Sequence, residues 1–322
     1  MRTTWMIAIT ILTIAFSTLP SAAKAQIAAP RLNPVAIDSS LVSPNRLIPA
    51  FNPAVLPWSG ASRVAVGRSD LEAEDTVLGI TQSANTGEGT VVQGRYVGES
   101  FALAAESHQF ELTDISTGAL SEIDGSLAAA AFRFGDMFSA GVSQQTAEIV
   151  DATNTNSATL PLLGATVRIG ESIFVGLATG EETVENTSAG ISVEADRTVT
   201  QIGVAYLARD GENGLHLEYY RQTVDAIDDP SYGTEDEQES AAFTVELIFS
   251  NVLVGYESMD NEISSATGTV VTDVGLTTIS LGWVPEEGLS IVASLQEEET
   301  TNAASGNVFR IETTVIAIAW LF

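Results

Sequence analysis

The residues best suited to act as general bases are the two histidines, His108 and His216. A hydrolase would need one of them beside a nucleophile, with a carboxylate to orient the ring. The chain has no Cys, and neither histidine is accompanied by a nucleophile elbow or by a carboxylate at a telling spacing. Single histidines on strands more often serve as hydrogen-bonding groups inside a fold. We therefore predict that the protein is not an enzyme, with a lipase as the least favoured class.

The composition of the chain excludes further classes of function. The 322 residues include 42 acidic and 13 basic side chains, for a formal net charge of −29, so no basic surface is available for nucleic acid. The lack of Cys excludes disulfides and Cys-ligated zinc, and no loop has EF-hand spacing, so we predict no cofactor and no metal. Mean hydropathy is nevertheless positive, at +0.19. Apolar and charged residues must therefore occupy different segments.

The N-terminus accounts for part of the hydropathy. Arg2 precedes an apolar run over residues 5–19, and Ala23-Lys24-Ala25 forms a small-x-small cleavage site. We predict that residues 1–25 are a cleaved signal peptide. No later stretch has 18 uninterrupted apolar residues, so the sequence predicts no transmembrane helix after it.

The rest of the chain alternates between large apolar and small or polar residues, as in residues 196–207 and 241–250. This period of two is typical of strands with two different environments. It predicts fourteen strands, near residues 62–69, 90–97, 101–109, 124–134, 138–149, 160–169, 172–181, 196–207, 215–224, 239–250, 252–259, 273–284, 289–297 and 308–322. An even number of such segments predicts an all-β fold, a transmembrane antiparallel β-barrel of about 14 strands over residues 62–322.

The predicted connections are alternately long and tight, as in outer-membrane barrels. Windows around the long ones contain 29 acidic residues and no Lys or Arg. We predict acidic outer loops, which keep the surface solvated, bridge to lipopolysaccharide through divalent cations, or repel anionic solutes at the mouth of the barrel.

The last segment places Trp320 and the terminal Phe322 on its apolar face, at the height of an interfacial girdle. This ending resembles the assembly signal of bacterial outer-membrane barrels. It predicts the cell outer membrane as the location, and outer-membrane lipid, lipopolysaccharide and the assembly machinery as partners of a monomer.

Counting from the apolar face also predicts which charged or polar side chains face the lumen. They are Arg95, Glu106, His108, Arg133, Arg168, His216, Glu218, Glu246 and Glu257. Their mixed signs indicate ion pairs that shape the lumen, and a ring that selects solutes is the alternative.

Residues 26–61 contain six of the ten prolines and cannot form a long regular element, yet they are too apolar for a linker. We predict a segment packed in the lumen. Its Asn52-Pro53-Ala54-Val55-Leu56, shortly before the first strand, resembles the hatch of FadL-type outer-membrane transporters of long-chain fatty acids and hydrocarbons.

The resemblance implies a 14-stranded barrel plugged by an N-terminal hatch, uptake of small hydrophobic or amphipathic, fatty-acid-like ligands, and gating by Phe51, Asn52, Pro53 and Ala54. The Gly/Ala-rich stretch usual upstream in this family is replaced by a Pro-rich one, which leaves the substrate open. A general diffusion porin and a structural barrel remain alternatives.

Overall fold

The computed structural model describes residues 52–58, 62–77, 80–114, 120–150, 154–188, 191–210, 213–227, 237–264, 270–284, 288–302 and 308–321. The predicted signal peptide, most of residues 26–61, Phe51 and Phe322 lie outside the described residues.

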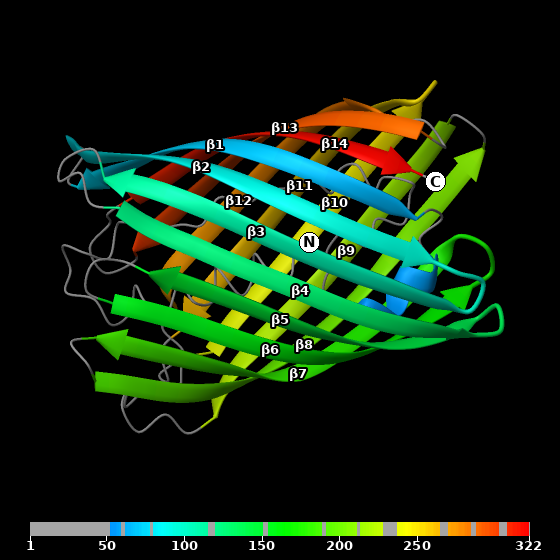
Figure 1. The fold of residues 1–322 in the computed structure, drawn as a ribbon, viewed down its shortest axis with the longest axis horizontal. Coiled ribbons are helices and arrows are strands. Elements are labelled where there is room, and N and C mark those ends of the chain that lie inside the picture. Colours follow the sequence, from blue (N-terminus) through cyan, green and yellow to red (C-terminus); the bar gives the residue numbers. More distant parts are fainter. Residues whose placement is uncertain are drawn as a thin grey trace.

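Within the described residues the chain forms one closed, antiparallel barrel of fourteen strands, which confirms the predicted all-β barrel and its strand number (Figure 1). The strands are β1 (Arg63–Val77), β2 (Ile80–Val97), β3 (Phe101–Asp114), β4 (Leu120–Phe134), β5 (Phe138–Val150), β6 (Asn154–Ile169), β7 (Ile173–Ser188), β8 (Ile191–Asp210), β9 (Asn213–Ile227), β10 (Glu237–Phe249), β11 (Val252–Ser264), β12 (Val270–Trp283), β13 (Gly288–Asn302) and β14 (Val308–Leu321). Each strand pairs with its neighbours in sequence, and β1 pairs with β14 to close the wall. No open sheet edge is therefore left.

The two faces of the wall differ as the alternation predicts. On β14, Ile316, Ile318 and Trp320 are about half exposed, whereas Ala317 and Ala319 between them are buried. The same pattern recurs around the barrel, because successive side chains on a strand point to opposite faces. The apolar outward residues form a band near one end of the barrel, and the buried residues face the lumen.

The strands extend further than the sequence predicted. The prediction of a long loop over residues 70–89 is wrong, because β1 continues to Val77 and β2 begins at Ile80. β11 and β12 similarly extend into the predicted loop 260–272. Beyond the apolar band the outward residues become polar while inward residues such as Leu71 and Leu276 stay apolar and buried, so large apolar side chains no longer mark the outer face although the backbone ladder continues.

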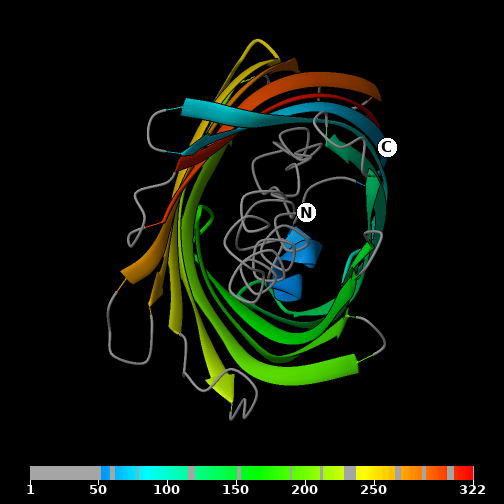
Figure 2. The same ribbon diagram turned by 90° about the vertical axis from the view of Figure 1, so that its left-hand side faces the viewer.

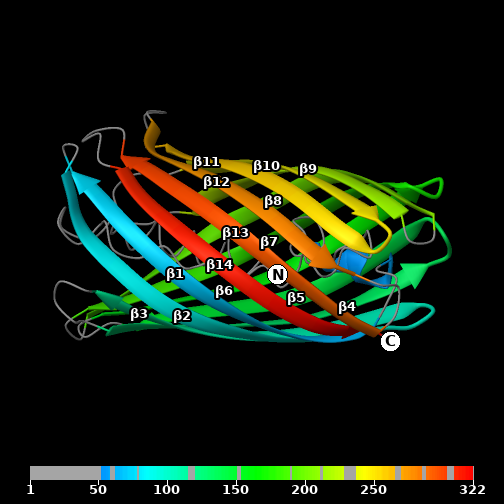
Figure 3. The same cartoon turned by 90° about the horizontal axis from the view of Figure 1, so that it is seen from above.

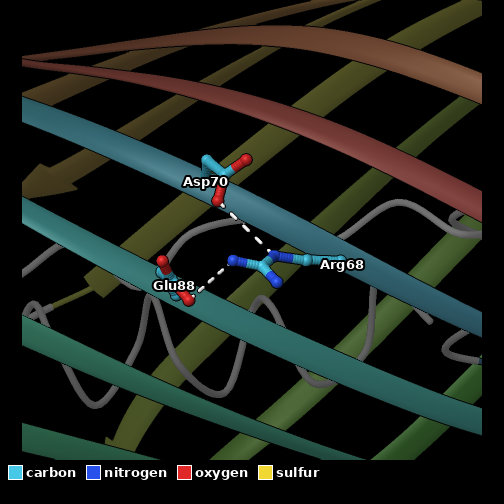
Figure 4. Close-up of polar contacts among 3 residues, drawn as sticks. All are labelled: Arg68, Asp70 and Glu88. Carbon is cyan, nitrogen blue, oxygen red and sulfur yellow. Dashed lines mark hydrogen bonds and ion pairs between the residues drawn. The ribbon is translucent and has the colours of Figure 1, made fainter.

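Most of the carboxylates assigned to loops therefore stand on strand ends. Asp70, Glu88, Glu111 and Glu122 are successive cross-strand partners on the outward face of β1 to β4. Arg68 lies between two of them: its Nη2 is 2.8 Å from Glu88 and its Nε 3.7 Å from Asp70 (Figure 4). Both contacts are solvent-exposed, so they offset little of the like-charge repulsion.

Tight turns join the strands at the end nearer the apolar band. Ser250 and Asn251 both have positive φ, 49° and 66°, as a two-residue turn between twisted strands requires. Gly135 and Gly170 occupy the same left-handed region in their turns. The predicted tight connections at these positions are confirmed.

A short 3-10 helix, η2 (Pro53–Trp58), lies inside the barrel at this tight-turn end, on the same side as the end of β14 (Figures 1 and 3). The end-on view places it within the ring of strands and against the wall (Figure 2). Its contacts are mainly with β4, β5 and β6. Across the described residues, we find no helix that combines the length and the apolar character needed to span a membrane.

Candidate functional site

Residues 52–58, which we call the hatch segment, are held against the inner wall by Asn52. This side chain is buried, and its Nδ2 donates to the main-chain oxygen of Ala165 at 2.7 Å and to Thr166 Oγ1 at 2.9 Å. Its Oδ1 accepts from the amide of Ala54 at 3.1 Å. One side chain thus caps the short helix and fixes it to β6.

Trp58 holds the other end of the hatch segment. Its Nε1 donates to Ser139 Oγ at 2.7 Å, and Ser139 in turn donates to the main-chain oxygen of Ala54. The guanidinium groups of Arg133 and Arg168 lie 5.1 Å and 5.6 Å from the centre of the Trp58 ring. Two such cation–π contacts with a shielded indole are each expected to contribute about 0.5–2 kcal/mol.

The wall is shaped to receive the hatch segment. Gly141 and Gly164 are partners on β5 and β6. A Cβ at Gly164 would collide with Asn52 Oδ1 and lie 2.9 Å from Pro53 Cδ, and one at Gly141 would lie 2.9 Å from the Pro53 carbonyl carbon. Only glycine permits so close a backbone approach. The sequence analysis did not predict this seat, by which we mean the close contact of Gly141 and Gly164 with Asn52 and Pro53. Its only trace in the sequence is a glycine at an inward position of each of two adjacent strands.

A small cavity lies beside Asn52, between the hatch segment and β7, β8 and β9. Ala178, Gln201 and Tyr220 are among its lining residues. The centre of a water-sized sphere can occupy about 10 Å³ of it, which is close to the minimum for a single water molecule. With the hatch segment in this position, the cavity is too small for a hydrophobic ligand.

All nine polar residues predicted to face the lumen point inward. Arg133 and Arg168 are partly exposed and contact Trp58, and the other seven are buried, namely Arg95, Glu106, His108, His216, Glu218, Glu246 and Glu257. Asn52, Pro53 and Ala54 are buried in the hatch segment, and Trp320 is exposed on the outside at 57%. Phe51 and Phe322 lie outside the described residues.

One group of inward-facing residues spans β1, β2 and β3, and it joins Glu106 and His108 to Arg63 and Gln93, which the sequence analysis did not single out. Arg63 donates to Gln93 Oε1, and Gln93 Nε2 donates to Glu106 Oε2 at 3.1 Å. Glu106 Oε1 lies 3.7 Å from His108 Nδ1. The Gln93 amide therefore connects the charged side chains of Arg63 and Glu106. The three residues meet because they occupy neighbouring inward positions on adjacent strands.

A second group lies on β9 and β10. His216 Nδ1 is 2.9 Å from Glu246 Oε2, and its Nε2 is 3.1 Å from Glu218 Oε2. A histidine can donate to two carboxylates only when both ring nitrogens carry hydrogen, as in the imidazolium. Each ring nitrogen of His216 has one carboxylate partner, which is the geometry of a buried imidazolium paired with two carboxylates.

Sequence reasoning missed Glu182, Arg197 and Gln145, which also face inward. They lie beyond the apolar band, where the outward neighbours Glu181 and Glu185 are charged as well, so polarity no longer distinguishes the faces. Burial raises the pKa of Glu182 to about 7, against an opposing effect of Arg197. Continuing to count every second residue beyond the apolar band would have placed all three side chains on the inward face.

Within the described residues, no group of three or more His, Cys, Asp or Glu is arranged to hold a metal ion. Glu246 is paired with His216, and Glu106 with Gln93. Thr244 stands between Glu218 and Glu257 in the register of β9, β10 and β11.

Comparison with known proteins rests on structure, because no family model and no curated protein matches the sequence. The CymD monoaromatic hydrocarbon channel matches 90% of this chain and 97% of its own length, with a TM-score of 0.56 and 11% identity. A Pseudomonas aeruginosa FadL homologue gives the same score and identity over 92% and 99%. The chain has the fold of the FadL-type channels.

The Pseudomonas putida toluene transporter TodX is a further match, with a TM-score of 0.52, 10% identity and coverage of 88% and 93%. By their descriptions, the first of these structures is a hydrocarbon channel, the second a FadL homologue and the third a toluene transporter. At such low identity the likeness shows the fold alone, so the functional residues must be argued from this chain.

Proposed function

We propose that this chain is an outer-membrane channel for the uptake of small hydrophobic or amphipathic molecules, with the hatch segment as its gate. The observation that carries the proposal is a hatch segment seated by specific contacts inside a closed 14-stranded barrel. A purely structural barrel has no need of a seated hatch segment, and an open porin would be narrowed by one.

The outer surface supports a place in the outer membrane. Trp283, Trp320, Phe132 and Phe249 are exposed near the tight-turn end. Such aromatic side chains gather where apolar lipid meets water. In this orientation the tight turns face the periplasm, and the acidic strand ends face outward, toward lipopolysaccharide.

The remaining partners follow from the same proposal. The barrel acts as a monomer, and closure of the wall leaves no strand edge to which a second copy could pair. Its C-terminal strand is recognised by the outer-membrane assembly machinery, and the signal peptide is removed during export.

The gate is expected to work by release of the hatch segment from β4, β5 and β6. Arg133 and Arg168 would then lose the Trp58 ring and face water, while the seat at Gly141 and Gly164 would open to the lumen. An apolar molecule in the lumen would favour release, because it can cover the wall that the hatch segment leaves.

Uptake into proteoliposomes with lipopolysaccharide in the outer leaflet tests the proposal. A radiolabelled long-chain fatty acid and dodecane should both enter faster than in protein-free liposomes, and Trp58→Ala should increase the rate and the ion conductance. Trp283→Ala, on the lipid side, is the matched control and should change neither. No uptake by the full chain, together with steady conductance in a planar bilayer, would favour a general diffusion porin instead.

A further inference from the structure

Two fully buried polar side chains in the lumen have hydrogen-bonding groups that the described structure leaves unsatisfied. Gln145 on β5 is 0% exposed, and both its amide nitrogen and its amide oxygen lack a hydrogen-bond partner. Glu182 on β7 is 1% exposed, and neither of its carboxyl oxygens accepts or donates a hydrogen bond. Such groups cost about 1–3 kcal/mol each when left unsatisfied, so each needs an explanation.

The wall places these two side chains on either side of one leucine. Gln145 is the partner of Leu160 on β6. The β6–β7 register, set by Thr159 with Thr183 and Leu162 with Gly180, brings Leu160 opposite Glu182. Adjacent strands are roughly 4.8 Å apart, so the backbones of Gln145 and Glu182 are separated by about 10 Å. Two long side chains and one small polar group can span that gap.

The surroundings of the pair are apolar. Leu127, Leu160, Leu162 and Val199 are buried neighbours on β4, β6 and β8. Arg197 is the cross-strand partner of Glu182 and lowers the pKa of this carboxyl by less than burial raises it. The leucine and valine side chains offer an apolar surface for an aliphatic chain.

We propose that Gln145 and Glu182 form a binding site for the hydroxyl group of a neutral aliphatic alcohol inside the lumen. The hydroxyl donates its hydrogen to a Glu182 oxygen and accepts one from Gln145 Nε2, while the alkyl chain lies on Leu160 and Leu162. A carboxylate head is disfavoured because its charge would be buried beside leucine side chains, and an alkane leaves both polar groups unsatisfied. This inference rests on the proposed function and names a substrate class for it.

Equilibrium binding tests the site separately from transport. The probes are tritiated 1-dodecanol and tritiated dodecane, measured by scintillation proximity on the full chain in lipid nanodiscs, with empty nanodiscs subtracted. The wild-type chain should bind dodecanol at least about tenfold more tightly than dodecane, and dodecanoate should compete poorly. Gln145→Leu and Glu182→Leu should each lower the alcohol-to-alkane preference by about tenfold.

Gln296→Leu is the matched control, because Gln296 is a buried inward glutamine on β13, across the barrel. Glu182→Gln keeps a hydrogen-bonding group and should retain most of the preference, which provides a reading if the leucine variant does not fold. An unchanged preference in both leucine variants, or an equal loss in Gln296→Leu, would overturn the site. The two proposals can fail separately. If liposome uptake fails while the preference for dodecanol over dodecane persists and depends on Gln145, the transport proposal is overturned and the binding site is retained.

Discussion

Docking of the hatch segment depends on the absence of a side chain at Gly164, so Gly164→Ala should release it. The added methyl would collide with Asn52 Oδ1 and force this side chain away from Ala165 and Thr166. Loss of these two hydrogen bonds and of the cap on Ala54, at about 1 kcal/mol each, weakens docking by about 2–3 kcal/mol. Since 1.4 kcal/mol corresponds to a factor of ten, the released population should rise by about 30- to 150-fold.

The chain contains no Cys, so a single engineered thiol reports on the hatch segment alone. Val55 is 2% exposed, and Val55→Cys changes its volume little. In that background, the rate of labelling by a bulky maleimide, read as a gel shift, measures release. Gly164→Ala should raise this rate by about 30-fold or more if the released state is the one that reacts.

The matched control is Gly94→Ala, because a Cβ at Gly94 would meet no atom within 4 Å. Its labelling rate should equal that of the Val55→Cys parent. Barrel integrity is checked for each variant by migration of unheated samples on a denaturing gel. A Gly164→Ala rate within twofold of the parent, in a folded barrel, would refute the argument that this glycine seats the hatch segment.

Three other perturbations have defined outcomes. Burial raises the pKa of Glu182 from 4.5 to about 7, so ionisation of this carboxyl is costlier in the folded state. The free energy of unfolding should therefore fall as pH rises from 4.5 to about 7, by at most about 3 kcal/mol. Glu182→Gln should remove this pH dependence in urea titrations of vesicle-embedded protein. Trp58→Phe keeps an aromatic ring but loses the bond to Ser139, so Val55→Cys labelling should rise about 3- to 10-fold, and an unchanged rate would contradict the role of this bond. Glu246→Leu leaves His216 without one of its two carboxylates and should lower the unfolding free energy by about 3 kcal/mol, measured by the same urea titration, whereas no loss would show that the pair is not buried as a unit.

The period of two in the sequence determined which face of the wall each residue occupies. Ile318 and Trp320 could be placed outside and Ala319 inside by counting along one strand, because successive side chains point to opposite faces between bulges. The same count placed Arg95, Glu106, His108 and the other lumen residues inward. Strand number and tight turns followed from the same local information, since Gly135 and Asn251 mark positions where the backbone must turn back.

Closure of the barrel decided what local pattern could not. The contacts of Asn52 with Thr166 and of His216 with Glu246 join residues that lie 114 and 30 positions apart, and they depend on the stagger between strands. The continuation of β1 through Asp70 to Val77 depends on a neighbouring strand to satisfy its backbone, not on its own hydrophobicity. For the same reason Gln145 and Glu182 became neighbours of one leucine only when β5, β6 and β7 were aligned. The sequence by itself determined the wall and its two faces, whereas cross-strand register, a property of the closed sheet, decided which side chains meet in the lumen.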